Sequence, residues 1–173
     1  HSYIKRRANE IGALAGFEKS GHYFLQPPIG RGYDDALVSA RVILEMLDRN
    51  PAKTMSQLFS DLPVSYGSPT MSPSCPDEVK YEVVDRVIAR FEALHEAGEP
   101  VAGRPIIDIN TVNGVRFTLE DGAWGLIRAS SNSPNLVIVV ESLASREDMK
   151  AIFAVIREEL ARHDEIGEFD QTL

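Results

Sequence analysis

The spacing of apolar residues predicts two halves with different architectures. In the first half, apolar residues recur at helical intervals in three stretches, residues 3–11, 35–49 and 54–62. Two short runs, residues 13–15 and 23–25, have the composition of strands, and a loop bracketed by glycines, residues 16–22, separates them. Two strands are too few for a stable sheet, so this half is interpreted as part of an α/β domain whose beginning is missing.

The second half predicts a helix, four antiparallel strands and a closing helix. Apolar residues at helical spacing indicate a first helix from Pro76 to about Glu96. The pair Asn113-Gly114 between two β-forming runs is a strong hairpin signal. Ser145 is expected to cap the last helix. This order predicts a separate two-layer α+β domain with an antiparallel four-stranded sheet and flanking helices.

The stretch between the two halves has the composition of a linker. It contains four prolines and four serines within residues 63–76. Prolines at this density favour extended or irregular backbone, so we expect a hinge over residues 63–75. The predicted domains are therefore residues 1–62 and residues 76–173.

Composition and charge narrow the classes of function. Of the 173 residues, 43% are hydrophobic and 25% are charged, which is typical of a globular protein. The net charge of −8 argues against nucleic acid and anionic membrane surfaces as partners. Because no run is long enough to span a membrane, no leader pattern is visible and the single Cys75 fits a reducing compartment, we expect a cytoplasmic protein. The helical pattern starts immediately after His1, and we expect the chain to be a piece of something longer.

The segment Arg128-Ala129-Ser130-Ser131-Asn132-Ser133-Pro134 lies between two predicted strands and is rich in hydrogen-bond donors. It has a guanidinium, three hydroxyls and an amide, and it has no carboxylate. Such a loop is suited to holding a phosphate, because the guanidinium fork matches phosphate geometry. The alternative is a solvated turn in which Ser and Asn bond their own backbone. The residue types alone leave both interpretations open.

A second candidate is the loop that contains Glu18, Ser20 and His22. A carboxylate beside a hydroxyl can hold neighbouring sugar hydroxyls, and His22 titrates near neutral pH and can move a proton. The alternative is a solvated loop in which His22 is an ordinary strand residue. The pair Asp34-Asp35 is interpreted as helix capping rather than as a metal site, because no third ligand is near in the sequence.

Five stretches together resemble one enzyme family, the α-D-phosphohexomutases, and within it the phosphomannomutase/phosphoglucomutase branch. They occur in the family's order and cover nearly the whole chain. The stretches are His1-Ser2-Tyr3-Ile4-Lys5, residues 16–22, Gly32-Tyr33-Asp34-Asp35, Asn113-Gly114-Val115-Arg116 and Gly125-Leu126-Ile127-Arg128-Ala129-Ser130.

The resemblance implies a four-domain enzyme of which this chain is the C-terminal part. Residues 1–62 would be the back half of the third, sugar-recognising domain, and residues 63–75 the hinge. Residues 76–173 would be the fourth domain, with a TATA-binding-protein-like sheet. The phosphorylated serine loop and the Mg²⁺ ligands would lie outside this chain, which itself would hold no metal. A hexose 1,6-bisphosphate would be the intermediate and activator.

The resemblance also implies roles for single residues. Glu18 and Ser20 would hold sugar hydroxyls, and His22 and His1 would lie near the transferring phosphoryl group as catalytic residues. The other phosphate would be bound by residues of the donor-rich loop, which are Arg128, Ser130, Ser131, Asn132 and Ser133. This loop departs from the frequent family sequence Arg-Ala-Ser-Asn-Thr at its fourth and fifth positions. Ala129 and Ser133 argue against the glucosamine branch. The sequence does not distinguish mannose from glucose as the preferred sugar.

The predicted function is therefore that of a phosphohexomutase, most specifically a phosphomannomutase, with the isolated chain inactive. A non-catalytic module that binds a sugar phosphate or another anion is the alternative, and an interaction domain that uses the open sheet is a third interpretation. The prediction requires the Arg128 loop to form an oxyanion pocket that faces the Glu18–His22 turn across a cleft.

Overall fold

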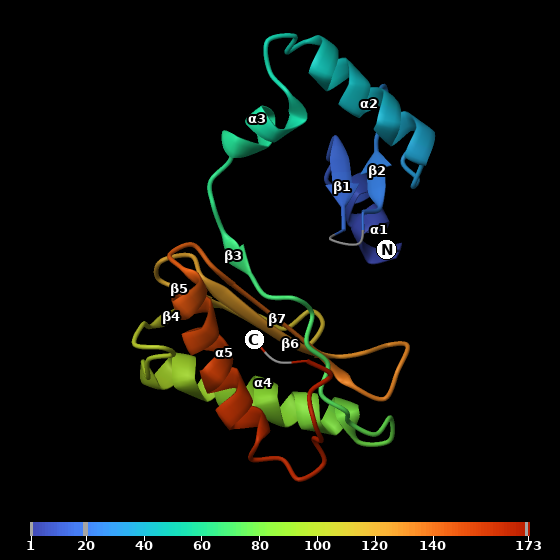
Figure 1. Cartoon of the computed structure of the whole chain (residues 1–173). Coiled ribbons are helices and arrows are strands. Elements are labelled where there is room, and N and C mark those ends of the chain that lie inside the picture. The colour runs from blue at the N-terminus through green and yellow to red at the C-terminus, as the bar shows by residue number, and fades with distance from the viewer. Residues whose placement is uncertain (1, 19–20, 172) are drawn as a thin grey trace. The chain divides into compact units, whose positions relative to one another are not determined.

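The chain divides after Pro63 into two units, residues 1–63 and residues 64–173. Figure 1 shows the computed structural model, which describes residues 2–18, 21–171 and 173. Each unit has its own helices and its own sheet, so each is described by itself.

In its described residues, the first unit is a strand pair with three helices. Its elements are α1 (Ser2–Glu10), β1 (Ala15–Phe17), β2 (Tyr23–Leu25), α2 (Ala36–Asp48) and α3 (Met55–Ser60). The strands β1 and β2 are antiparallel, with Ala15 opposite Leu25 and Phe17 opposite Tyr23. The predicted strand at 13–15 therefore begins later and extends into the predicted loop. The two strands pair up to the turn between them, because the backbone groups of each antiparallel strand form hydrogen bonds with the other.

The apolar face of α2 is not buried, which corrects the sequence prediction. The helix forms where the periodicity placed it, with Asp35 as the N-cap. However, Leu37 is 83% exposed and Leu44 is 66% exposed. Among the described residues of this unit, the buried hydrophobic side chains are those of Ala8 and Phe24. A two-stranded sheet is too small to cover a 13-residue helix, so the helix lacks the surface that would bury it.

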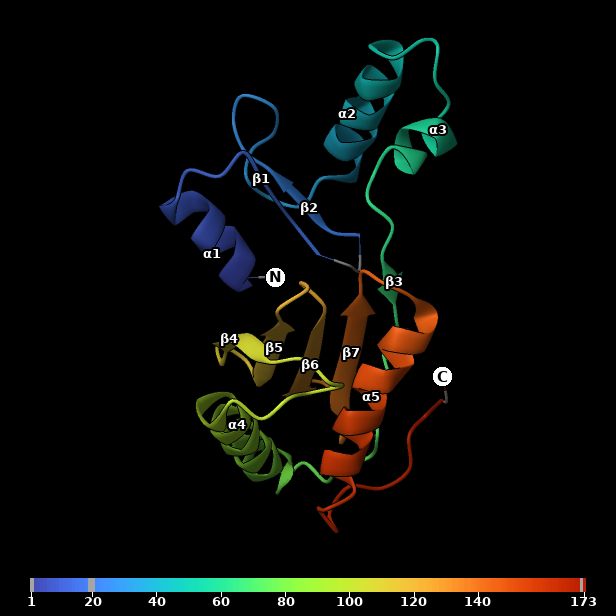
Figure 2. The ribbon, with the colours of Figure 1, turned by 90° about the vertical axis from the view of Figure 1, so that its left-hand side faces the viewer.

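The second unit is a five-stranded antiparallel sheet with two helices. Its elements are β3 (Tyr66–Gly67), α4 (Lys80–Ala97), β4 (Ile106–Asn110), β5 (Val115–Leu119), β6 (Trp124–Ala129), β7 (Leu136–Ser142) and α5 (Arg146–Leu160). The strand order is β3-β7-β6-β5-β4, which can be followed across Figure 2. Alternate residues of β5, β6 and β7 are buried, and the core lies between that face and the helices. The other face of the sheet is only partly covered.

The fifth strand comes from the stretch that was predicted to be a hinge. Tyr66 and Gly67 pair with Ser142 and Glu141 at the open edge of β7. Further along, Met71 is fully buried and bridges to the same strand. The prediction of four strands was thus one strand short, and most of residues 63–75 belong to the second unit. An exposed strand edge offers unpaired backbone groups, and an extended proline-containing segment can satisfy them. The likeness to a TATA-binding-protein fold stays a prediction.

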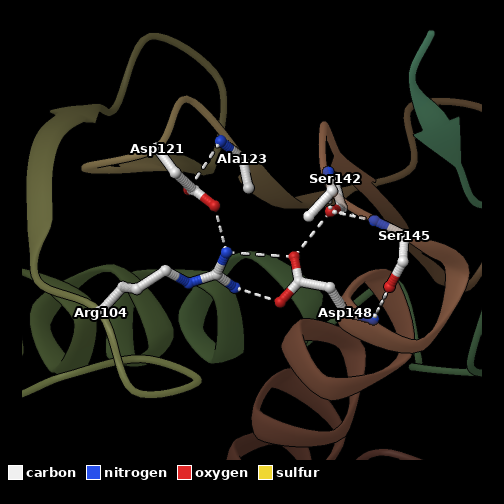
Figure 3. A network of polar contacts seen from close by, with 7 residues as sticks. Arg104, Asp121, Ala123, Ser142, Ser145 and Asp148 are labelled. Atoms are coloured by element: carbon white, nitrogen blue, oxygen red, sulfur yellow. Dashed lines mark hydrogen bonds and ion pairs between the residues drawn. The ribbon is translucent and has the colours of Figure 1, made fainter.

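A polar network fixes the start of α5 to the sheet (Figure 3). The guanidinium of Arg104 donates to both carboxylate oxygens of Asp148, at 2.8 and 3.1 Å, and also to Asp121. Ser142 donates to Asp148 at 2.6 Å. Burial alone would lower the pKa of Arg104, but the bonds to the two carboxylates outweigh this and raise it. The network links the turn before β4, the end of β7 and the first turn of α5.

Candidate functional site

The donor-rich loop connects β6 to β7 at one end of the sheet. Arg128 and Ala129 still pair with Val137 and Leu136 of β7. The loop closes through the Ser130 amide, which donates to the Asn135 carbonyl at 3.0 Å. The sequence therefore positioned this loop correctly, because the strands on both sides had unambiguous β-forming composition.

Two of the three serine hydroxyls hold the loop together. The hydroxyls of Ser130 and Ser133 lie 2.9 Å apart, and Ser133 also donates to the Asn135 side chain at 2.9 Å. The Asn132 amide donates to the Ser130 hydroxyl at 3.3 Å. The Ser130 hydroxyl thus bonds the loop backbone, as the turn interpretation expects, whereas Ser133 has side-chain partners, and Ser131 and Asn132 are exposed at the tip. The predicted roles of these residues in phosphate binding stay predictions. Asn135, which the sequence analysis did not single out, belongs to the same framework.

Arg128 lies on β6, with its side chain on the partly covered face of the sheet. One of its N–H groups donates to the Ala129 carbonyl at 3.0 Å. Within the part of the chain that the structure describes, no carboxylate forms an ion pair with it. A guanidinium has five N–H donors, so most of them are left for an anion beside the loop tip. Arg128 is therefore not neutralised by a described carboxylate, which leaves its guanidinium able to bind an oxyanion.

Beneath the loop lies Lys80, which the sequence analysis missed. This lysine is only 4% exposed. Its ammonium donates to the Ser130 carbonyl at 2.5 Å, to the Ser133 carbonyl at 3.1 Å and to the Asp77 carboxylate at 2.6 Å. The first residue of α4 therefore holds both ends of the loop tip.

A signal for Lys80 was present in the sequence. The buried stripe of α4 includes Val84, Val87, Phe91 and Leu94. Lys80 lies four residues before Val84 and is in phase with this stripe, so helical periodicity predicts that its side chain is on the core side. A lysine on a buried stripe needs oxygen partners, and the nearest strand end supplies them.

In the first unit, His22 is oriented by Asp34. The His22 Nδ1 lies 2.5 Å from one oxygen of Asp34, and the Tyr23 amide donates to the other oxygen at 3.3 Å. The hydrogen bond from His22 lowers the pKa of Asp34, with further help from Tyr23, although desolvation opposes the shift. Because a carboxylate accepts and does not donate, Nδ1 carries the proton. Capping was therefore the wrong role for Asp34, whereas Asp35 does cap α2.

The turn around Glu18 is closed by its backbone. The Glu18 amide donates to the His22 carbonyl at 3.0 Å, and the Gly21 amide donates to the Glu18 carbonyl at 2.9 Å. Glu18 and His22 are thus brought together. His1 and Ser20 lie outside the described residues, so their predicted roles stay predictions. The predicted approach of this turn to the Arg128 loop also stays a prediction, because the loops belong to different units.

The described residues contain neither a metal-binding cluster nor a membrane-spanning helix. No group of three or more His, Cys, Asp or Glu side chains could hold a metal ion. Helices with the length and apolar character needed to cross a membrane are likewise missing from the described part of the chain. Cys75 is fully buried, and burial raises the pKa of its thiol, so it has the character of a core residue.

Known proteins that resemble this chain share closely related family names. Residues 1–66 match the family described as phosphoglucomutase/phosphomannomutase, alpha/beta/alpha domain III. A phosphomannomutase/phosphoglucomutase of Pseudomonas aeruginosa is 32% identical over 164 residues, covering 95% of this chain and 32% of that protein. A probable phosphoglucosamine mutase of Methanothermobacter thermautotrophicus is 36% identical over 139 residues, covering 80% of this chain and 28% of that protein.

A solved structure shows the same kind of relationship. The crystal structure of a phosphoglucomutase/phosphomannomutase family protein from Burkholderia thailandensis matches with a TM-score of 0.71 and 25% identity. The match covers 94% of this chain and 31% of that one. The chain spans about a third of the length of the curated relatives it matches. The relatives' names differ in the hexose they give, so they support a family and not one sugar.

Proposed function

We propose that this chain, which belongs to the α-D-phosphohexomutase family of phosphoglucomutases and phosphomannomutases, holds the phosphosugar in an isomerase of that family. The proposed reaction interconverts hexose 6-phosphate and hexose 1-phosphate through a hexose 1,6-bisphosphate. Mannose phosphate and glucose phosphate are the proposed substrates. The observation that carries the proposal is the loop of residues 128–135, in which Arg128 and the exposed tip offer donors without an internal carboxylate.

The loop suits the phosphate that is not being transferred. Phosphoryl transfer depends mainly on positioning and on stabilising charge. Binding energy from the remote phosphate orients the reacting end of the sugar, so a cation beside the loop tip would contribute to the rate. A bisphosphate must also present each of its phosphates in turn. Arg128, Ser131 and Asn132 read only the phosphate oxygens, and such a loop accepts either one.

The first unit would act on the sugar and on the proton. The carboxylate of Asp34 holds the His22 ring in one orientation and one tautomer, which suits proton transfer or charge stabilisation near a phosphoryl group. Glu18, in the same turn, has the acceptor oxygens that sugar hydroxyls need. We propose these roles for Glu18 and His22 together with Ser20 and His1.

The family resemblance implies Mg²⁺, but the described residues do not fit it. They contain no cluster of acids, histidines or cysteines that could hold a metal ion. No metal step is therefore assigned to this chain, and we propose that the ligands and the phosphorylated serine lie on other residues. Turnover is not expected from these residues alone.

Phosphosugar binding to the 173-residue chain tests the proposal. We expect isothermal titration calorimetry to detect binding of glucose 1-phosphate and mannose 1-phosphate but not of glucose or mannose. Arg128→Ala should weaken phosphosugar binding by about 1.5–3 kcal/mol, the range for hydrogen bonds to charged groups.

The matched control is Arg146→Ala, which removes an exposed arginine from the first turn of α5 in the same unit. This variant should bind phosphosugars like the unsubstituted chain. Equal affinity of the Arg128→Ala chain and the unsubstituted chain would contradict the assignment of the loop.

A further inference from the structure

Lys80 is a buried cation outside the residues assigned to the phosphate loop. Removing an ammonium from water costs several kcal/mol, so a lysine that is 4% exposed must be compensated by nearby oxygens. An ammonium has three N–H donors, and Lys80 has three oxygen partners. Two of the three are backbone carbonyls of the loop, which lies 50 residues further along the chain. Packing of α4 alone does not require this arrangement.

The two carbonyls belong to residues on either side of the loop tip. Ser130 and Ser133 flank Ser131 and Asn132, so one ammonium ties both ends of the tip to the start of α4. Carbonyl oxygens repel an anion, and here the ammonium draws two of them inward. The two carbonyl oxygens, which carry partial negative charge, therefore do not point toward the side of the loop where a phosphate would bind.

Peptide geometry turns this inward pull into an outward donor. In a trans peptide, the N–H of one residue points opposite to the carbonyl of the residue before it. Because the Ser130 carbonyl is directed at Lys80, the Ser131 N–H points away from Lys80. Across the described residues, that N–H has no backbone or side-chain acceptor within hydrogen-bond distance, whereas the backbone amides of Ser130 and Asn132 both donate to acceptors in the loop. It is therefore placed to bind an anion beside the exposed hydroxyl of Ser131.

We propose that Lys80 is a positioning residue for phosphate binding, which holds residues 130–133 in the conformation that presents the Ser131 amide to the anion. This inference rests on the proposed function, because it concerns the same loop. Lys80 does not touch the phosphate itself, since its three donors are already used within the protein.

The experiment uses the full 173-residue chain, labelled with ¹⁵N and titrated with inorganic phosphate. In the unsubstituted chain, we expect the Ser131 amide signal to shift on titration. Lys80→Met keeps an unbranched side chain of nearly the same length but removes the ammonium. We expect it to weaken phosphate binding about tenfold or more and to speed hydrogen exchange at Ser131 and Asn132 without ligand. Lys80→Arg, which keeps the charge, should recover part of the affinity.

Two further variants separate positioning from charge and from general stability. Lys150→Met removes an exposed lysine of α5 and should leave phosphate affinity unchanged. Asp77→Asn keeps both bonds from Lys80 to the loop and removes a carboxylate near it. Phosphate affinity should then stay equal or increase, because the loss of a nearby negative charge favours an anion. If Lys80→Met does not fold, the phosphate affinities of Lys80→Arg and Asp77→Asn test the positioning role in its place.

The outcomes distinguish this inference from the proposed function. Unchanged phosphate affinity and unchanged exchange at Ser131 in Lys80→Met overturn the positioning role. A tenfold loss of affinity in Asp77→Asn also overturns it. If phosphate causes no shift at residues 128–133 in the unsubstituted chain, the proposed function fails at this loop. The exchange rates of the Lys80 variants then still show whether Lys80 orders the tip.

Discussion

Burial separates the roles of the two basic residues at the loop. Lys80 is fully enclosed, and its three donors end on protein oxygens, so its charge serves the shape of the loop. Arg128 is partly exposed and has one bond to a neighbouring carbonyl, so its remaining donors are available to a ligand. Residue type alone does not distinguish these roles, because both side chains are cations that can bind phosphate.

Asp34 and His22 give a prediction at the scale of one residue. The hydrogen bond from His22 holds the pKa of Asp34 below its usual value of 3.8. His22→Ala should return this pKa toward 3.8, measured by NMR titration of the side-chain carboxyl carbon. A titration of Asp34 that is identical in the two proteins would show that His22 does not stabilise the carboxylate.

The sign of the pH dependence follows from this shift. A carboxyl whose pKa is lower in the folded state than in the unfolded state stabilises the fold above its unfolded pKa. The contribution of Asp34 is therefore complete above about pH 3.8 and is lost as the pH falls through the lowered value. In His22→Ala this part of the acid dependence of unfolding should become smaller, because only the bond from the Tyr23 amide still lowers the pKa of Asp34.

At the scale of the element, α5 depends on its first turn. Ser145 caps the helix by accepting a hydrogen bond from the Asp148 amide at 3.0 Å. The Asp148 carboxylate accepts hydrogen bonds from Arg104 and Ser142. These bonds tie the helix to the end of β7 and to the turn before β4 (Figure 3). Because this network sets the position of the start of α5 on the sheet, we expect the first turn of α5 to contribute more to stability than its exposed face.

Asp148→Asn should therefore destabilise the second unit. The change leaves the largely buried guanidinium of Arg104 with one carboxylate partner, and we expect a loss of about 2–3 kcal/mol in the free energy of unfolding. Urea denaturation followed by the fluorescence of Trp124 measures it, because Trp124 lies on β6 of the same sheet. The control Glu147→Gln changes an exposed acid in the same turn, and should cost only about 0.3–1 kcal/mol through the helix dipole. Similar losses in both variants would argue against the network.

At the scale of the whole molecule, the two units differ in how much core they contain. The second unit buries its sheet face and both helices in one cluster. In the described part of the first unit, the helix α2 has no buried residue and leaves Leu37 and Leu44 exposed. Hydrophobic burial is the main favourable term in folding, so stability must be uneven along the chain.

Hydrogen exchange followed by mass spectrometry tests this difference. We expect the amides of α4 to be protected roughly 100-fold or more relative to those of α2. Val87→Ala, which removes methyl groups from the core of the second unit, should lower protection in residues 64–173 and leave residues 1–63 unchanged. Equal protection of α2 and α4 would show that the exposed face of α2 is covered in solution.

The sequence by itself determined the local features of this protein. Helical spacing located α2, α4 and α5, the strand runs placed the loop of Arg128, and Ser145 capped α5 as predicted. These features depend on contacts within a few residues, which a sequence displays directly. Five stretches in family order were equally visible, and they led to the family that the comparisons support.

Only the tertiary structure decided the features that join distant residues. In the tertiary structure, residues 66–67 form an edge strand beside β7, and Lys80 lies beneath a loop 50 residues away. Asp34 binds His22 and does not cap the helix. The tertiary structure also leaves α2 uncovered, although its periodicity predicted burial. The physical reason is the same in each case. The partner of a strand edge, of a buried ammonium or of an apolar face depends on what folding brings near, and neighbouring residues in the chain do not specify it.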